Sequence, residues 1–132
     1  MNTDHEHNAV LSEQAIALNS MVAECHGRSV RAGWYNDLKT GDPLTRNVGE
    51  MLALVHSEVS EALEGHRKNL NDSHLPARKA IEVELADAVI RIFDLAGYLN
   101  LDLGGAYAEK LIYNARRADH KPEVRLHGGK AF

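Results

Sequence analysis

Residues 47–69 read N-V-G-E-M-L-A-L-V-H-S-E-V-S-E-A-L-E-G-H-R-K-N, and their apolar side chains recur every three or four positions. This spacing is typical of a helix that buries one face. The predicted buried stripe consists of Val48, Leu52, Val55, Val59 and Ala62 or Leu63. Glu58 and Glu61 run beside the stripe, roughly 60° apart around the axis and about 4.5 Å apart along it. Two like charges at the border of an apolar face are destabilising unless a positive charge lies between them, and a metal cation would supply that charge.

A second pair of carboxylates has the same spacing. Glu84 and Asp87 lie in another apolar-periodic segment, residues 75–99. We expect the first helix to end near Asn69 and the second to start at Pro76, because proline is favoured at the first helical position. The two segments then form an antiparallel hairpin.

In such a hairpin the two pairs lie at matching heights. Glu61 and Glu84 are each eight residues from the predicted turn, about 12 Å along the helix, while Glu58 and Asp87 are each eleven residues away, about 16 Å. All four carboxylates can therefore converge on one patch.

The ordinary alternative is a pair of salt-bridged helix faces. Arg91 and Asp94 continue the side that carries Glu84 and Asp87. Two interpretations are open for them, orientation of the site and a solvated helix face, and we favour the second.

The composition indicates an all-α protein with one domain. The chain has 132 residues, 44% of them apolar and 26% charged, and its aromatic content of 5% favours helices packed through aliphatic side chains. Cys25 is the sole cysteine, so an internal disulfide is excluded and a reducing cytoplasmic setting is expected. No apolar run approaches membrane-spanning length, and the first residues do not resemble a secretory signal.

The chain divides into three parts by its sequence pattern. We expect a disordered tail over residues 1–10, a helical domain over 11–118, and a basic, glycine-containing tail over 119–132. Within the domain a first helix is predicted from Ser12, as N-cap, to about His26, and a fourth from about Ala106 to Arg117.

Charge is unevenly distributed. Residues 1–109 contain 9 Lys and Arg against 17 Asp and Glu, whereas residues 110–132 contain 6 against 2. A protein that binds duplex nucleic acid would have a dominant basic stripe, so that class is disfavoured. The pattern suits a polyanion held by cations on one side and by Lys and Arg on the other, although simple solubility charge would also produce it.

Several residues outside the hairpin are candidates for ligand binding. The loop at 33–47 contains the only tryptophan, Trp34, which either seals the edge of the core or stacks on a ligand base. Lys110, Asn114 and Arg117 are spaced at i, i+4 and i+7, so they share one polar face of the fourth helix.

The carboxylate set favours a hard cation. Four carboxylates without neighbouring His or Cys ligands indicate Mg²⁺, or Mn²⁺ as a substitute, over zinc. A di-iron bundle also lines its core with Glu, but it requires Glu-x-x-His pairs, and neither helix of the hairpin contains one.

These motifs resemble the MazG-like nucleotide pyrophosphohydrolases. The resemblance covers about residues 30–132 and rests on E-V-S-E (58–61), E-L-A-D (84–87), K-L-I-Y-N-A-R-R (110–117) and H-G-G-K (127–130). The family belongs to an all-α superfamily that includes dimeric dUTPases, dCTP pyrophosphatases and phosphoribosyl-ATP pyrophosphohydrolases. The resemblance implies a four-helix bundle whose central antiparallel hairpin carries the metal site.

The resemblance also implies an activity. Glu58, Glu61, Glu84 and Asp87 would hold Mg²⁺ on a nucleoside triphosphate, most simply a dNTP, and Lys110 and Asn114 would contact the substrate, which yields a nucleoside monophosphate and pyrophosphate. Such a reaction would clean the nucleotide pool. Glu61, at the centre of the patch, is our choice for the residue that takes the proton of the attacking water.

The resemblance also implies a homodimer or homotetramer. We expect Arg117 to hold phosphate or sugar, as its charge suits a leaving pyrophosphate. The charge pattern and the hydropathy disfavour duplex nucleic acid and a membrane as partners. The alternatives are hydrolysis of phosphoribosyl-ATP and a catalytically silent helical adaptor with the same fold.

The basic end of the chain is a candidate lid. Gly128 and Gly129 let the backbone approach a ligand closely, and His127 and Lys130 beside them are donors suited to phosphate oxygens. We expect residues 125–132 to be mobile without ligand and to close over the phosphates when ligand binds. A disordered C-terminus is the alternative.

Overall fold

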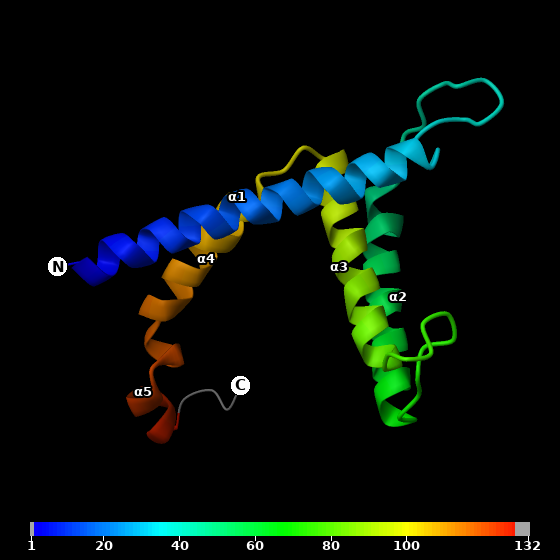
Figure 1. Cartoon of the computed structure of the whole chain (residues 1–132). Helices are drawn as coiled ribbons and strands as arrows, with labels where there is room; N and C mark the ends of the chain where they lie inside the picture. Colours follow the sequence, from blue (N-terminus) through cyan, green and yellow to red (C-terminus); the bar gives the residue numbers. More distant parts are fainter. Residues whose placement is uncertain (1, 129–132) are drawn as a thin grey trace. The chain divides into compact units, whose positions relative to one another are not determined.

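The computed structural model describes residues 2–128, and its regular elements in this range are helices (Figure 1). They are α1 (Asn2–Arg31), α2 (Val48–Arg67), α3 (Ala80–Tyr98), α4 (Leu103–Arg116), the 3₁₀ helix η1 (Ala118–His120) and α5 (Pro122–Leu126). Extended pairing within residues 2–128 is confined to the isolated bridges Asn36–Pro43 and Asn71–Lys79. The all-α prediction is therefore confirmed.

The chain forms two compact units. One consists of Met21–Leu101 and contains α2 and α3; the other consists of Met1–Ser20 together with Asp102–Phe132 and contains α4. Helix α1 contributes to both units. None of the helices in the described part of the chain has the length and apolarity that a membrane-spanning helix requires.

The hairpin of α2 and α3 has the register that the sequence predicts. At one end, a Cβ added to Gly65 would lie 2.8 Å from the Cβ of Ala80, so only a glycine permits this close approach. At the other end, the backbone N–H of Arg46 donates a hydrogen bond to the Tyr98 hydroxyl over 3.0 Å. The two helices therefore run antiparallel and side by side, as Figure 1 shows.

The connection between the two helices is longer than predicted, because α3 begins at Ala80 instead of Pro76. Asp72 is buried, and its Oδ2 accepts hydrogen bonds from the backbone N–H groups of His74 (2.8 Å) and Leu75 (2.6 Å). These bonds hold residues 72–75 in a folded turn of the kind that an Asp side chain forms with the backbone that follows it. The extra loop residues lie outside the paired part of the hairpin and leave its register unchanged.

The core of the unit formed by Met21–Leu101 is small. Tyr35, Met51 and Leu95 form the buried cluster, and Val48 and Tyr98 pack against it. The buried positions of α2 are Met51, Glu58, Ala62 and Gly65. Three members of the predicted stripe, Leu52, Val59 and Leu63, are instead about half exposed. The predicted stripe contains apolar residues only, whereas the buried face of α2 also includes Glu58 and Gly65.

Helix α1 is longer than predicted at both ends. It begins at Asn2, so residues 2–10 are helical where a disordered tail was expected, and it continues past His26 to Arg31. His26 itself lies against α3, where a Cβ added to Gly97 would overlap the His26 side chain. His26 is therefore fixed by close packing.

In the second unit, Asn19 of α1 is bonded to the start of α4. Its Nδ2 donates to Asp102 Oδ1, and its Oδ1 accepts from the Gly104 N–H, both over 2.8 Å. Asp102 also caps the helix by accepting from the Gly105 N–H over 2.9 Å, which explains why α4 starts at Leu103 and not at Ala106. Within the segment predicted as a basic tail, two short helices form, over residues 118–120 and 122–126.

Candidate active site

Three of the four predicted carboxylates come together in the hairpin. Glu58 of α2 and Glu84 and Asp87 of α3 each offer an oxygen within 4.8 Å of the others. The register explains this meeting: Glu58 lies seven residues before Gly65, and Asp87 lies seven residues after Ala80. Glu84 precedes Asp87 by three residues, close to one helical turn.

Glu61 is not part of this three-residue group. Its side chain is exposed, and its carboxylate lies close enough to Glu84 to contribute to the raised pKa of that residue. The predicted patch is therefore three converging carboxylates with a fourth beside them.

The group has an excess of negative charge. Burial, followed by repulsion from Glu61 and by the Glu58 and Asp87 carboxylates, raises the pKa of Glu84 from 4.5 to about 7. Burial and the charge of Glu58 also raise the pKa of Asp87, and the nearby Arg91 opposes this. A bound cation would relieve these repulsions.

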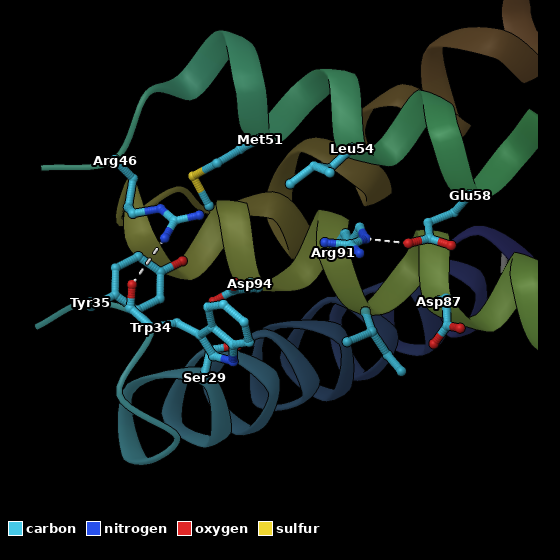
Figure 2. A pocket seen from close by; sticks show the side chains of 11 residues that line it. Ser29, Trp34, Tyr35, Arg46, Met51, Leu54, Glu58, Asp87, Arg91 and Asp94 are labelled. Carbon is cyan, nitrogen blue, oxygen red and sulfur yellow. Dashed lines mark hydrogen bonds and ion pairs between the residues drawn. The ribbon is translucent and has the colours of Figure 1, made fainter. Parts of the chain in front are cut away.

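Arg91 pairs with the group, contrary to the solvated face that we predicted for it. Its Nε donates a hydrogen bond to Glu58 Oε1 in an ion pair (Figure 2). The Glu58 side chain is 9% exposed and that of Arg91 is 42% exposed. Asp94, assigned to the same solvated face, is also only partly exposed and pairs with His26. Sequence periodicity placed both residues on the correct side of α3 but could not identify their partners.

A cavity of about 540 Å³ adjoins the carboxylates (Figure 2). Glu58 and Asp87 line it and also belong to the three-carboxylate group. The remaining lining comes from α1, the following loop, α2 and α3, and consists of Ser29, Trp34, Tyr35, Arg46, Met51, Leu54, Ile90, Arg91 and Asp94. The volume lies within the range of small-molecule sites.

Trp34 lies at this cavity and not in the core. It is 64% exposed, and its backbone carbonyl accepts a hydrogen bond from Arg46 Nη1 over 3.1 Å. The next residue, Tyr35, is 8% exposed and takes the core position that one interpretation gave to Trp34. The indole therefore offers an accessible aromatic surface beside the carboxylates.

Tyr35 and Asp94 line the cavity, and His26 and Tyr98 contact them. His26 Nδ1 and Asp94 Oδ1 are 2.9 Å apart, and the rings of His26 and Tyr35 meet edge to face at 4.9 Å. The Tyr35 ring also stacks on Tyr98 at 5.0 Å. The Tyr35 hydroxyl is buried without a hydrogen-bond partner among residues 2–128, and burial together with the neighbouring Asp94 raises its pKa.

Sequence reasoning did not identify Tyr35 or Arg46 as part of the site. Tyr35 adjoins Trp34 in an irregular segment, where no periodicity separates an inward from an outward side chain. Arg46 directly precedes Asn47, the N-cap of α2. Its nearness to the start of that helix was the one available signal.

The loop that carries Trp34 is held by its own hydrogen bonds. Asp37 Oδ1 accepts from the backbone N–H groups of Lys39 (2.8 Å) and Thr40 (2.9 Å), and the Gly41 N–H donates to the Asp37 carbonyl over 2.7 Å. Asn36 Nδ2 donates to the Gly41 carbonyl over 3.1 Å. These bonds give the loop a defined conformation.

The other predicted substrate contacts belong to the second unit. Lys110 Nζ lies 4.5 Å from the centre of the Tyr113 ring, and Arg117 pairs with Asp119. Asn114 Oδ1 is buried without a partner among the described residues, and His127 is exposed. Lys130 lies outside the described residues. Contact of these side chains with a ligand at the carboxylates stays a prediction.

The donor set fits a hard divalent cation. The group offers carboxylate oxygens only, from Glu58, Glu84 and Asp87, and includes no His or Cys. Mg²⁺ prefers oxygen ligands and commonly completes its coordination with water and phosphate, while zinc sites normally include nitrogen or sulfur ligands from His or Cys. The residues present therefore match Mg²⁺ or Mn²⁺.

No protein-family model, curated protein or solved structure matches this chain. The resemblance to the MazG-like pyrophosphohydrolases rests on its motifs alone.

Proposed function

We propose that this chain is a Mg²⁺-dependent pyrophosphohydrolase that converts a nucleoside triphosphate, in the first instance a dNTP, to a nucleoside monophosphate and pyrophosphate. One observation carries the proposal. Three carboxylates from two helices lie within 4.8 Å of one another, and two of them also line a cavity that includes an accessible indole. A triphosphate and its base require these two features side by side.

Glu58, Glu84 and Asp87 are the residues that would hold Mg²⁺. Bound there, the ion would screen the phosphate charge and lower the pKa of the attacking water. By holding the cation, the carboxylates would fix the position of the triphosphate that the cation contacts. Hydrolysis would then depend mainly on positioning and electrostatic stabilisation.

Glu61 is our candidate for the general base. It is the predicted carboxylate that lies outside the three-residue group, and it is exposed beside Glu84. A carboxylate that is not committed to a cation can accept a proton from water. Its side chain would then take the proton as the water attacks phosphorus.

The cavity would hold the nucleoside. The face of Trp34 can stack on a base, an interaction of about 1–3 kcal/mol that tolerates different bases. Arg46, whose guanidinium is already oriented by the Trp34 carbonyl, supplies further N–H donors in the same wall.

Lys110, Asn114 and Arg117 would contact phosphate or sugar, and His127 and Lys130 would close over the phosphates. Lys and Arg are suited to the charge that collects on the leaving pyrophosphate. The basic composition of residues 110–132, with 6 Lys and Arg against 2 Asp and Glu, supports this part of the proposal.

We further propose that the chain acts as a cytoplasmic homodimer or homotetramer. Several large apolar side chains of α2 and α3 are about half exposed, among them Leu52, Val59, Leu63, Leu85 and Val89. Burial of such side chains against another copy would be favourable, at about 25 cal/mol for each Å² of apolar surface. Light scattering coupled to size exclusion would give the mass in solution.

Pyrophosphate release tests the function directly. The purified full chain is incubated with a panel of canonical and damaged dNTPs and NTPs, with Mg²⁺ and with EDTA. The proposal requires pyrophosphate and nucleoside monophosphate from at least one substrate, and no turnover in EDTA. Asp87→Asn is the inactive comparison. Absence of turnover over the whole panel would contradict the proposed function.

A further inference from the structure

The ion pair between Arg91 and Glu58 concerns the same carboxylate that the proposed cation requires. Arg91 donates from Nε to Glu58 Oε1, and Glu58 is the most buried member of the three-carboxylate group. Among the described residues, no ion pair joins a Lys, Arg or His side chain to Glu84 or Asp87. The guanidinium of Arg91 thus supplies one positive charge to the group.

A guanidinium and a divalent cation compete for this carboxylate. Arg91 Nε uses one lone pair of Glu58 Oε1, and a cation on the same carboxylate would place two positive charges about 4 Å apart, which repel each other strongly where solvent is partly excluded. Glu58 has little access to water that could screen this repulsion, since its side chain is 9% exposed. Cation binding at the three carboxylates therefore weakens the Arg91–Glu58 contact.

The released side chain has a second place to bind. Arg91 lines the cavity together with Glu58, Asp87 and Trp34, and its own side chain is 42% exposed, so it can move without unpacking the core. A triphosphate bound across the carboxylates and the cavity would bring several negative oxygens to this wall. A guanidinium forms strong paired hydrogen bonds with phosphate.

We infer that Arg91 exchanges partners: it neutralises Glu58 in the free protein, and it transfers to the substrate phosphates when the cation takes its place. This inference rests on the proposed function for the identity of the phosphate ligand. Its consequence is a thermodynamic coupling. Arg91 weakens cation binding to the free protein, and the triphosphate removes that competition, so each of the two ligands strengthens the binding of the other.

The test measures cation affinity without turnover. Mn²⁺ is titrated into the full chain in the absence of nucleotide, and electron paramagnetic resonance measures the free ion. The proteins compared are wild type, Arg91→Met and Arg91→Lys. Arg78→Met is the matched control, because it removes the same charge from an exposed residue that pairs with Glu82 away from the cavity. We expect Arg91→Met to bind Mn²⁺ about tenfold more tightly, Arg91→Lys to stay within about threefold of wild type, and Arg78→Met to stay within about twofold.

The second arm adds a non-hydrolysable deoxynucleoside triphosphate. Wild type should gain Mn²⁺ affinity about tenfold when the analogue is bound, and Arg91→Met should gain less than threefold, since the competition has already been removed. The analogue itself should bind Arg91→Met more weakly than wild type at saturating Mn²⁺.

Each outcome decides the inference. Unchanged or weaker Mn²⁺ binding by Arg91→Met, an equal change in Arg78→Met, or no Mn²⁺ binding by any variant would overturn the exchange. If Arg91→Met does not fold, the Nε–H resonance of Arg91 is followed in wild type during titration with Mg²⁺, and an unperturbed resonance would overturn it. Tighter Mn²⁺ binding by Arg91→Met without any triphosphate hydrolysis by wild type would keep the competition and reject the proposed function.

Discussion

Replacement of Glu84 by Gln is expected to stabilise the protein above neutral pH in the absence of divalent cations. The pKa of Glu84 rises from 4.5 to about 7 on folding, because burial and the neighbouring carboxylates disfavour its charged form. The folded state therefore holds a proton more tightly than the unfolded state. The contribution of Glu84 to the free energy of unfolding is therefore highest at low pH. It falls as the pH rises from about 4.5 to about 7 and is constant above that.

The size of the effect follows from the two pKa values. A difference of about 2.5 corresponds to about 3 kcal/mol at 1.36 kcal/mol for each tenfold change in proton affinity. Glu84 is only partly buried, so solvent screening reduces the expected effect to about 1–2 kcal/mol. Glu84→Gln retains the shape of the side chain and removes the charge, and it should gain this amount at pH 8 and nothing at pH 4.

Urea unfolding followed by circular dichroism between pH 4 and pH 8, with EDTA present, measures the difference. Glu82→Gln is the control, because Glu82 lies in the same helix, is exposed, and pairs with Arg78 outside the acidic group. Addition of Mg²⁺ should stabilise wild type more than Glu84→Gln. A lower stability of Glu84→Gln at pH 8, or a difference that does not change with pH, would refute the argument that Glu84 is held in a like-charge cluster.

Three further outcomes are expected. Trp34→Ala should raise KM more than it lowers kcat, and an unchanged KM with a lowered Tm would instead make Trp34 a structural residue. In wild type, a non-hydrolysable triphosphate with Mg²⁺ should change the Trp34 fluorescence. Glu61→Gln should lower kcat at least a hundredfold and keep the Mn²⁺ affinity within about threefold of wild type. Asp87→Asn should lower kcat and also weaken Mn²⁺ binding. An equal loss of Mn²⁺ binding in the two variants would make Glu61 a metal ligand. Deletion of residues 125–132 should lower kcat/KM at low ionic strength with little change in the Tm of the ligand-free protein, and full activity of the truncated chain would contradict a lid.

The hairpin register could be predicted from the sequence because it depends on how many residues separate each carboxylate from the turn. The predicted helix ends, Asn69 and Pro76, are not the observed ones, yet they imply the same pairing as the Gly65–Ala80 contact. A helix rises by a fixed length for each residue, so the relative heights of Glu58 and Asp87 are correct even though the turn was misjudged.

Side-chain partners could not be predicted in the same way. Arg91 was assigned to a solvated face because its spacing on α3 says nothing about which residue of α2 its long side chain reaches. Trp34 and Tyr35 are adjacent aromatic residues in an irregular segment, and only the tertiary packing determines that Tyr35 is buried and Trp34 exposed. The predicted contacts of Lys110 and Asn114 depend on how a separate unit meets a ligand, which helix periodicity does not address.

The ordered loop of residues 36–43 has a consequence for how specificity can change. Its hydrogen bonds through Asp37, Asn36 and Gly41 fix the backbone next to Trp34, and a fixed loop loses little conformational entropy on binding. The loop contributes none of the three carboxylates, which lie on α2 and α3. Under the proposed function, substitutions in the loop would therefore alter which base is accepted while the acidic group stays intact, and the two properties would evolve independently on one short chain.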